Sequence, residues 1–159
     1  MRMRHESSYD ATADEVYAML ADPAFREASA DAQNCVSVDV TITETDRAMS
    51  VVVDQIQRTQ GLPSFAKKFA GDTTRAIQRE EWSDERHATL VIETPGKPGS
   101  MSGTITLEDD GAGCLEIVEL DVRFPVPLIG GKIERLMGDL VIAGMRIEQE
   151  VGAAWLAGE

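Results

Sequence analysis

Apolar and polar residues alternate over residues 35–43, where Val36, Val38, Val40 and Ile42 are separated by serine, aspartate and threonine. A period of two places every second side chain on the same face, so this stretch predicts a strand with one buried and one exposed face. Residues 3–9 alternate in the same way. Similar patterns predict further strands near residues 48–59, 73–83, 86–94, 100–108 and 113–124.

Helical spacing replaces the alternation at three places. Residues 12–15, Thr-Ala-Asp-Glu, form a capping box ahead of apolar residues at helical spacing, which predicts a short helix over 12–21. Asp22-Pro23 ends that helix and starts a second one, which stops before Asn34. From 128 to 157 an apolar stripe predicts one amphipathic helix of about 28 residues, which spans roughly 40 Å.

The order of these elements is a strand, two short helices, six strands and a long helix. It predicts an α+β fold with an antiparallel curved sheet, and with the C-terminal helix lying across the sheet's concave face. One helix rarely fills such a face completely. We therefore expect an apolar cavity between the sheet and this helix.

The connections between strands sort into two groups, because successive turns of an antiparallel meander fall at opposite ends. One end receives the short polar turns ETDR, SDER and EDDGAG. The other end receives LPSFAKKFAG, PGKPG and FPVPLIGGK, which are longer and more apolar. These segments contain all four lysines of the chain, Lys67, Lys68, Lys97 and Lys132.

Length and composition narrow the class of protein. The 159 residues are expected to form one domain over 1–159, and a formal net charge of -13 argues against nucleic-acid binding. Cys35 and Cys114 have no CxxC spacing, so we expect no metal and no cofactor. With no secretory or membrane-spanning segment evident, we expect a cytoplasmic location. No pattern indicates an oligomeric state.

Two segments carry a family resemblance. DATADEVYAML follows the first strand, and FPVPLIGGKIERLM leads into the last helix. In this order they resemble the START-like helix-grip superfamily, also called SRPBCC, and within it a bacterial group known only as a domain of unknown function. The resemblance implies a hydrophobic cavity that carries lipids, sterols or polyketides, or in some branches cyclises or hydrolyses them. It transfers no catalytic residue.

We expect the ligand to contact apolar residues around this cavity. The candidates are Leu62, Phe65, Phe69, Leu120, Val122, Phe124, Leu128, Ile129, Ile133, Leu136, Met137 and Leu140. Aromatic residues make up only 5% of the chain, so the wall is expected to be aliphatic and to suit acyl or isoprenoid chains. An alternative for the 62–71 segment is a one-turn helix that packs Phe65 and Phe69 into the core.

The four lysines are expected to surround the mouth of this cavity. They would contact an anionic ligand head group or the surface of an anionic membrane, where each basic residue contributes about 1 kcal/mol of attraction. A protein partner at the same apolar surface is a further alternative.

Three residues are weak catalytic candidates. His5 and Tyr9 share a strand face, expected to be the inner one. Glu80 and Glu81 point to opposite faces, so one carboxylate can face inward and act as an acid with a raised pKa. For Glu80, an outward charge beside Arg79 is the stronger expectation. We therefore interpret the chain as a non-catalytic carrier of a hydrophobic molecule, with a polyketide cyclase or dehydratase type of enzyme as the alternative.

Overall fold

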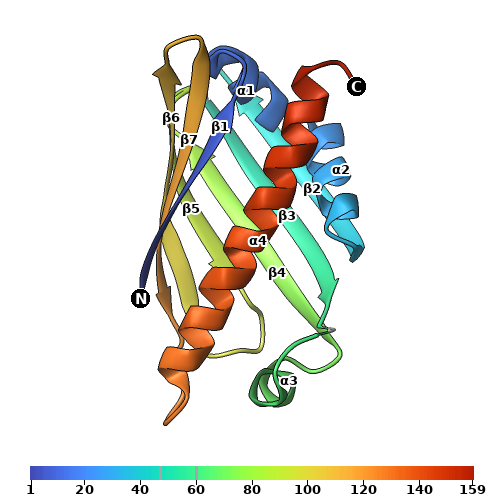
Figure 1. Ribbon diagram of the computed structural model, residues 1–159, viewed down its shortest axis with the longest axis vertical. Helices are drawn as coiled ribbons and strands as arrows, with labels where there is room; N and C mark the ends of the chain where they lie inside the picture. The colour runs from blue at the N-terminus through green and yellow to red at the C-terminus, as the bar shows by residue number, and fades with distance from the viewer. Residues whose placement is uncertain (47, 60) are drawn as a thin grey trace.

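The computed structural model describes residues 1–46, 48–59 and 61–159 and shows a curved sheet with helices on its concave side (Figure 1). The elements are β1 (Arg2–Tyr9), α1 (Ala13–Leu20), α2 (Pro23–Ala32), β2 (Cys35–Thr45), β3 (Ala48–Arg58), α3 (Ser64–Ala70), β4 (Thr73–Trp82), β5 (His87–Glu93), β6 (Ser100–Asp110), β7 (Gly113–Arg123) and α4 (Gly130–Leu156). Within the described residues, seven strands form one antiparallel sheet in the order β1-β7-β6-β5-β4-β3-β2. The predicted α+β helix-grip arrangement is confirmed.

Alternation along each strand decides which side chains face the core. On β2 the apolar residues from Val38 to Ile42 are half-buried, and the polar residues between them are exposed. A β-bulge between Cys35 and Ser37 shifts the register at the start of β2 and leaves Val36 49% exposed. The predicted inner face is therefore confirmed from Val38 onward but not at Val36.

Local capping explains where the two short helices begin. The Thr12 hydroxyl accepts a hydrogen bond from the Glu15 amide at 3.1 Å, and the Glu15 carboxylate accepts one from the Thr12 amide at 3.1 Å. This confirms the predicted capping box. Asp22 caps α2 by accepting from the Ala24 amide at 2.9 Å, with Pro23 in the first helical position.

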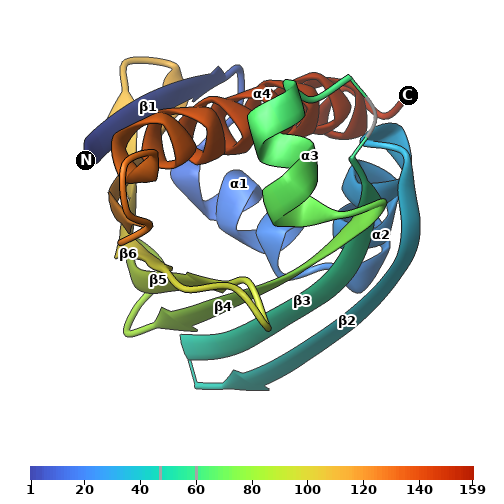
Figure 2. The same cartoon turned by 90° about the horizontal axis from the view of Figure 1, so that it is seen from below.

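Helix α4 runs diagonally across the concave face, and the sheet curves around it (Figures 1 and 2). Its main contacts are with β1 and β7 of the sheet and with α1 and α2. Within the described residues α4 makes no comparable contact with β3, β4 or β5, so space remains over that half of the sheet. None of the helices in the described part of the chain is long and apolar enough to cross a membrane.

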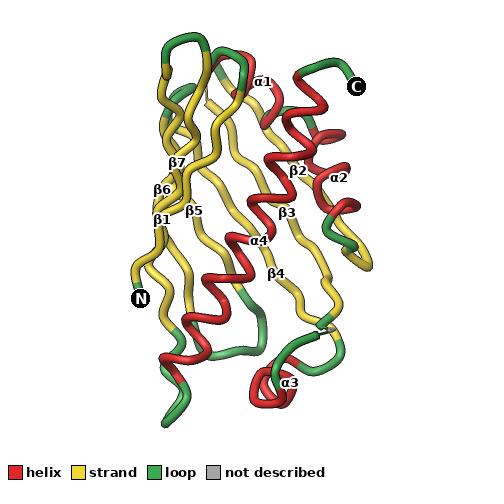
Figure 3. The backbone as a smooth tube through the Cα atoms, viewed as in Figure 1, coloured by secondary structure: helices red, strands yellow, loops and turns green. Residues whose placement is uncertain are grey.

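The connections gather at two ends of the sheet, as predicted (Figure 3). Helix α3, the β5–β6 connection and the start of α4 share one end, and the β4–β5 and β6–β7 turns share the other. Seen along the sheet from the α3 end, α3 lies between α4 and the strands β3 and β4 (Figure 2).

Candidate ligand-binding cavity

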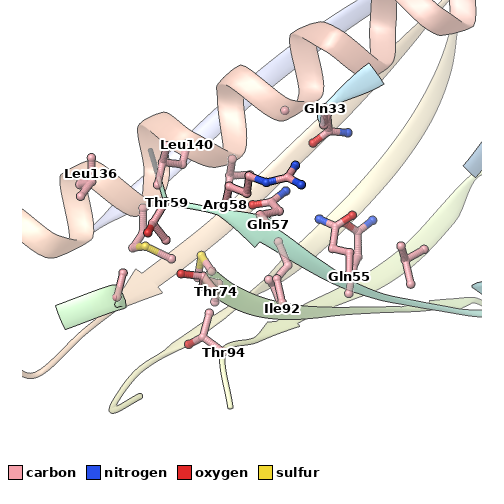
Figure 4. Close-up of a pocket in the computed structure, with 18 of the residues that line it drawn as sticks. Gln33, Gln55, Gln57, Arg58, Thr59, Thr74, Ile92, Thr94, Leu136 and Leu140 are labelled. Carbon is pink, nitrogen blue, oxygen red and sulfur yellow. The ribbon is translucent and has the colours of Figure 1, made fainter. Parts of the chain in front are cut away.

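A cavity of about 200 Å³ lies between α4 and the concave face of the sheet. Its lining residues come from β3, β4, β5 and β6, from α2 and α4, and from the segment that contains α3 (Figure 4). Leu140 lines the cavity and is 43% exposed, and the cavity is partly open to solvent. The structure therefore contains a cavity where the order of the elements predicts one.

Helical residues form the apolar side of the cavity. They are Leu62, Ala66, Phe69 and Ala70 from α3 and the residues before it, and Ile133, Leu136, Met137, Leu140, Val141 and Met145 from α4. The Phe69 ring packs edge-on against Phe124, with ring centroids 6.1 Å apart. This contact holds α3 against the core beside the cavity.

Strand and α2 residues form a polar side. They are Ser29 on α2 and Gln33 at its C-cap, Gln55, Gln57, Arg58 and Thr59 on or just after β3, Thr74 and Gln78 on β4, and Thr94 after β5. The expected aliphatic wall is therefore wrong for this side. The physical reason is a change along β3, whose inner face carries Val51 and Val53 in one half and Gln55 and Gln57 in the half near α3.

A buried ion pair lies at the inner end of the cavity. Two Arg26 nitrogens donate to the two Glu80 oxygens at 2.8 and 2.9 Å, and the Arg26 Nε donates to the Leu20 carbonyl at 2.8 Å. Trp82 and Gln78 also donate to the Glu80 carboxylate, at 2.9 and 2.6 Å. Burial opposes ionisation of Glu80, but the Arg26 charge and these hydrogen bonds outweigh it and lower the pKa of Glu80. Glu80 is therefore ionised and fully partnered.

Two more carboxyl groups lie near this pair. Burial, followed by the charges of Glu148 and Glu80, raises the pKa of Glu116 to about 8. Burial also raises the pKa of Glu148, against the opposing charge of Arg26. Glu116 faces inward from β7, and Glu148 lines the cavity from α4. Glu116 thus keeps its proton at neutral pH, and Glu148 keeps its proton to a higher pH than an exposed glutamate does.

The predicted ligand-binding residues divide into two sets. Six line the cavity: Leu62, Phe69, Ile133, Leu136, Met137 and Leu140. The other six lie elsewhere. Leu120, Val122 and Phe124 are fully buried in the core on the β7 side, where α4 packs against the sheet and no space remains. Phe65 and Ile129 pack partly buried against that core, and Leu128 is fully exposed.

None of the three catalytic candidates lines the cavity. His5 and Tyr9 do lie on the inner face of β1, and the His5 Nε2 and the Tyr9 hydroxyl are buried without a hydrogen-bond partner in the described part of the chain. The expected outward orientation of Glu80 is wrong. Strand alternation turns Glu80 inward and leaves Glu81 exposed, and the Arg26 contact lowers the pKa of Glu80 instead of raising it.

The four lysines have different surroundings. Lys97 lines the cavity, whereas Lys67 and Lys68 are exposed on α3 and Lys132 is exposed in the first turn of α4. Residues 64–70 form a short helix that packs Phe65 against the core, which agrees with the helical alternative for this segment.

Sequence reasoning missed the polar side of the cavity and the partners of Glu80. A signal for Gln55 and Gln57 was present, because they continue the period of two set by Val51 and Val53 and so belong to the same face. Arg26 gave no such signal, since it lies on a helix 54 residues before Glu80.

Comparison with known sequences finds a family match over almost the whole chain. A family model described as "Protein of unknown function (DUF2505)" matches residues 4–156. The uncharacterized protein Rv0481c of Mycobacterium tuberculosis is 24% identical over 117 residues, which is 70% of this chain and 67% of the relative.

Comparison with solved structures shows the same fold. A START superfamily protein from Mycobacterium smegmatis is 14% identical, with a TM-score of 0.65 over 98% of each chain. The Zhui aromatase/cyclase from Streptomyces sp. R1128 is 15% identical, with a TM-score of 0.63 over 99% of this chain and 93% of that one. At these identities the likeness shows a START-like helix-grip fold.

Proposed function

We propose that this chain, which belongs to the family of proteins of unknown function DUF2505, binds a small hydrophobic molecule between the sheet and α4. The observation that carries the proposal is the cavity itself. Its α4 side includes Leu136, Met137 and Leu140, and it is partly open to solvent. When an apolar ligand displaces water from an apolar surface of this kind, the free energy of binding is favourable.

The volume limits the size of the molecule. About 200 Å³ is smaller than the roughly 300–1,000 Å³ of typical ligand pockets. We propose that a larger molecule extends through the mouth or displaces α3. Gly71 follows α3 directly and Gly61 precedes it by three residues, with φ of 74° and 80°, so the chain changes direction at a glycine on each side of this helix.

Uptake of a fluorescent apolar probe tests the proposal. The neutral dye 1-aminoanthracene should bind with a fluorescence increase, and Leu140→Trp should abolish the increase because the larger side chain fills the space beside α4. Ala143→Trp is the matched control, since it places the same side chain at an exposed position on α4. Equal uptake by both variants and the wild type would contradict binding in this cavity.

An enzymatic use of the same cavity is the second candidate, and one observation favours it. The Glu148 carboxyl group lines the cavity with a raised pKa, which suits a general acid. Molecules that co-purify with the protein can be extracted, incubated with fresh protein and weighed by mass spectrometry. A changed mass that Glu148→Gln abolishes would support catalysis, and an unchanged mass would support carriage.

We also propose that the exposed lysines guide the α3 end to anionic surfaces. Lys67, Lys68 and Lys132 are exposed at the end of the sheet where α3 lies, on a chain with a net charge of -13. Binding to vesicles that contain phosphatidylserine should fall as salt rises, because salt screens exposed charges. Binding that Lys67→Ala and Lys68→Ala leave unchanged would contradict this contact.

A further inference from the structure

The cavity has two chemically different sides that face each other. The α4 side is apolar and consists of Leu136, Met137, Leu140, Val141 and Met145. Among the described residues of α4 that line the cavity, Glu148 at the inner end is the one with a charged side chain. The opposite side carries side-chain amides and hydroxyls from α2, β3, β4 and the end of β5, together with the cations Arg58 and Lys97. In Figure 4, Gln57 lies beside Arg58 on the strand side of the cavity, and Thr74 and Thr94 lie beside Ile92.

Part of this polar side has no partner within the protein. Thr94 is 5% exposed and lines the cavity, and its hydroxyl makes no hydrogen bond in the described part of the chain. Buried hydroxyls are normally hydrogen-bonded, so this covered and unpartnered hydroxyl would gain a hydrogen bond if a ligand oxygen reached it. By contrast, the Gln78 amide already donates to Glu80, and the Gln33 amide donates to Ser29 at 3.1 Å.

The chemistry of the polar side suits oxygen-bearing groups of a ligand. Glutamine amides and threonine hydroxyls each donate and accept hydrogen bonds. Arg26 is neutralised by Glu80, whereas Arg58 and Lys97, which also line the cavity, can donate hydrogen bonds to ligand oxygens. Hydroxyl or carbonyl oxygens of a ligand would therefore be bound here, while its opposite edge contacts the apolar α4 side.

We propose that the ligand is a compact carbon skeleton with two or more hydroxyl or carbonyl oxygens on one edge, bound with that edge toward Gln55, Gln57 and Thr94. This inference rests on the proposed ligand binding and specifies its chemistry. It replaces the fatty acyl or isoprenoid chain expected from the sequence, because a plain hydrocarbon would leave the polar side without partners.

Positional isomers test the one-sided arrangement. In 2,7-dihydroxynaphthalene both hydroxyls lie on one long edge, in the 2,6 isomer they lie on opposite edges, and naphthalene has none. The three have similar size, and neither isomer forms an internal hydrogen bond. Displacement of 1-aminoanthracene measures each affinity. The wild type should bind the 2,7 isomer about 3- to 10-fold more tightly than the 2,6 isomer, as expected for one additional hydrogen bond.

Two variants test which side chains cause the preference for the 2,7 isomer. Gln57→Leu and the isosteric Thr94→Val should each reduce the preference while naphthalene still binds, which also shows that the variants fold. Thr89→Val is the matched control, because Thr89 is exposed on the outer face of β5, the strand that ends just before Thr94. It should keep the wild-type preference.

The outcomes separate this inference from the function on which it rests. Equal binding of both isomers and naphthalene to the wild type would overturn the one-sided recognition and leave hydrophobic binding intact. A preference that Gln57→Leu and Thr94→Val both retain would overturn the assignment to this wall. If neither naphthalene nor 1-aminoanthracene binds, both the inference and the proposed function are overturned.

Discussion

The buried ion pair makes a sharp prediction about stability. Glu80→Gln keeps the size of the side chain but removes the negative charge opposite Arg26, whose side chain is 4% exposed. Removing one partner of a buried pair leaves an uncompensated charge and costs about 3–5 kcal/mol of unfolding free energy. With a urea m-value of about 2 kcal/mol per molar, the unfolding midpoint should fall by roughly 1.5–2.5 M.

Urea unfolding followed by tryptophan fluorescence and by circular dichroism measures this shift. The matched control is Glu93→Gln, which breaks the Arg79–Glu93 pair at 2.7 Å on the outer face, where both side chains are about half exposed. Exposed pairs contribute only about 0–1 kcal/mol, so this variant should change little. A Glu80→Gln midpoint no lower than that of Glu93→Gln would refute the assignment of the buried pair as a structural contact.

Three further predictions concern acidity, packing and capping. The pKa of Glu116 is raised from 4.5 to about 8 in the folded state, so the folded protein becomes less stable as pH rises through this range. At about 1.4 kcal/mol per pKa unit, the unfolding free energy should fall by roughly 3–5 kcal/mol. Glu116→Gln should therefore equal the wild type in unfolding free energy near pH 4 and exceed it at pH 9, and equal curves would contradict the raised pKa. Gly103→Ala should lower the melting temperature strongly, because the new Cβ would lie 1.8 Å from the Glu119 carbonyl oxygen. Gly131→Ala is the control, since its Cβ would meet no atom within 4 Å, and it should keep the wild-type melting temperature. Thr12→Ala removes the cap of α1 and should cost about 1 kcal/mol in urea unfolding; no loss would show that the capping box does not stabilise α1.

The fold was predictable because its signals are local. A capping box at Thr12, an Asp-Pro break at residue 22 and alternation along β2 each report on a few neighbouring residues. The long stripe of α4 is local in the same sense, and an antiparallel meander leaves few ways to arrange the strands.

The site was only partly predictable because it depends on where α4 touches the sheet. Leu136 and Phe124 are both apolar and both face inward, yet the first lines the cavity and the second is fully buried. The difference arises because α4 packs against β7 and stands away from β3–β5, which no local pattern encodes. The inward turn of Glu80 is likewise stabilised by Arg26, which is distant in the sequence.

The position of a bound molecule tests the central claim most directly. Native mass spectrometry of the protein mixed with 1-aminoanthracene should show one bound molecule per chain for the wild type and for Ala143→Trp. The complex should be absent for Leu140→Trp, whose new side chain fills the cavity between α4 and the sheet. An identical one-to-one complex with Leu140→Trp, or no complex with the wild type, would contradict ligand binding at this site.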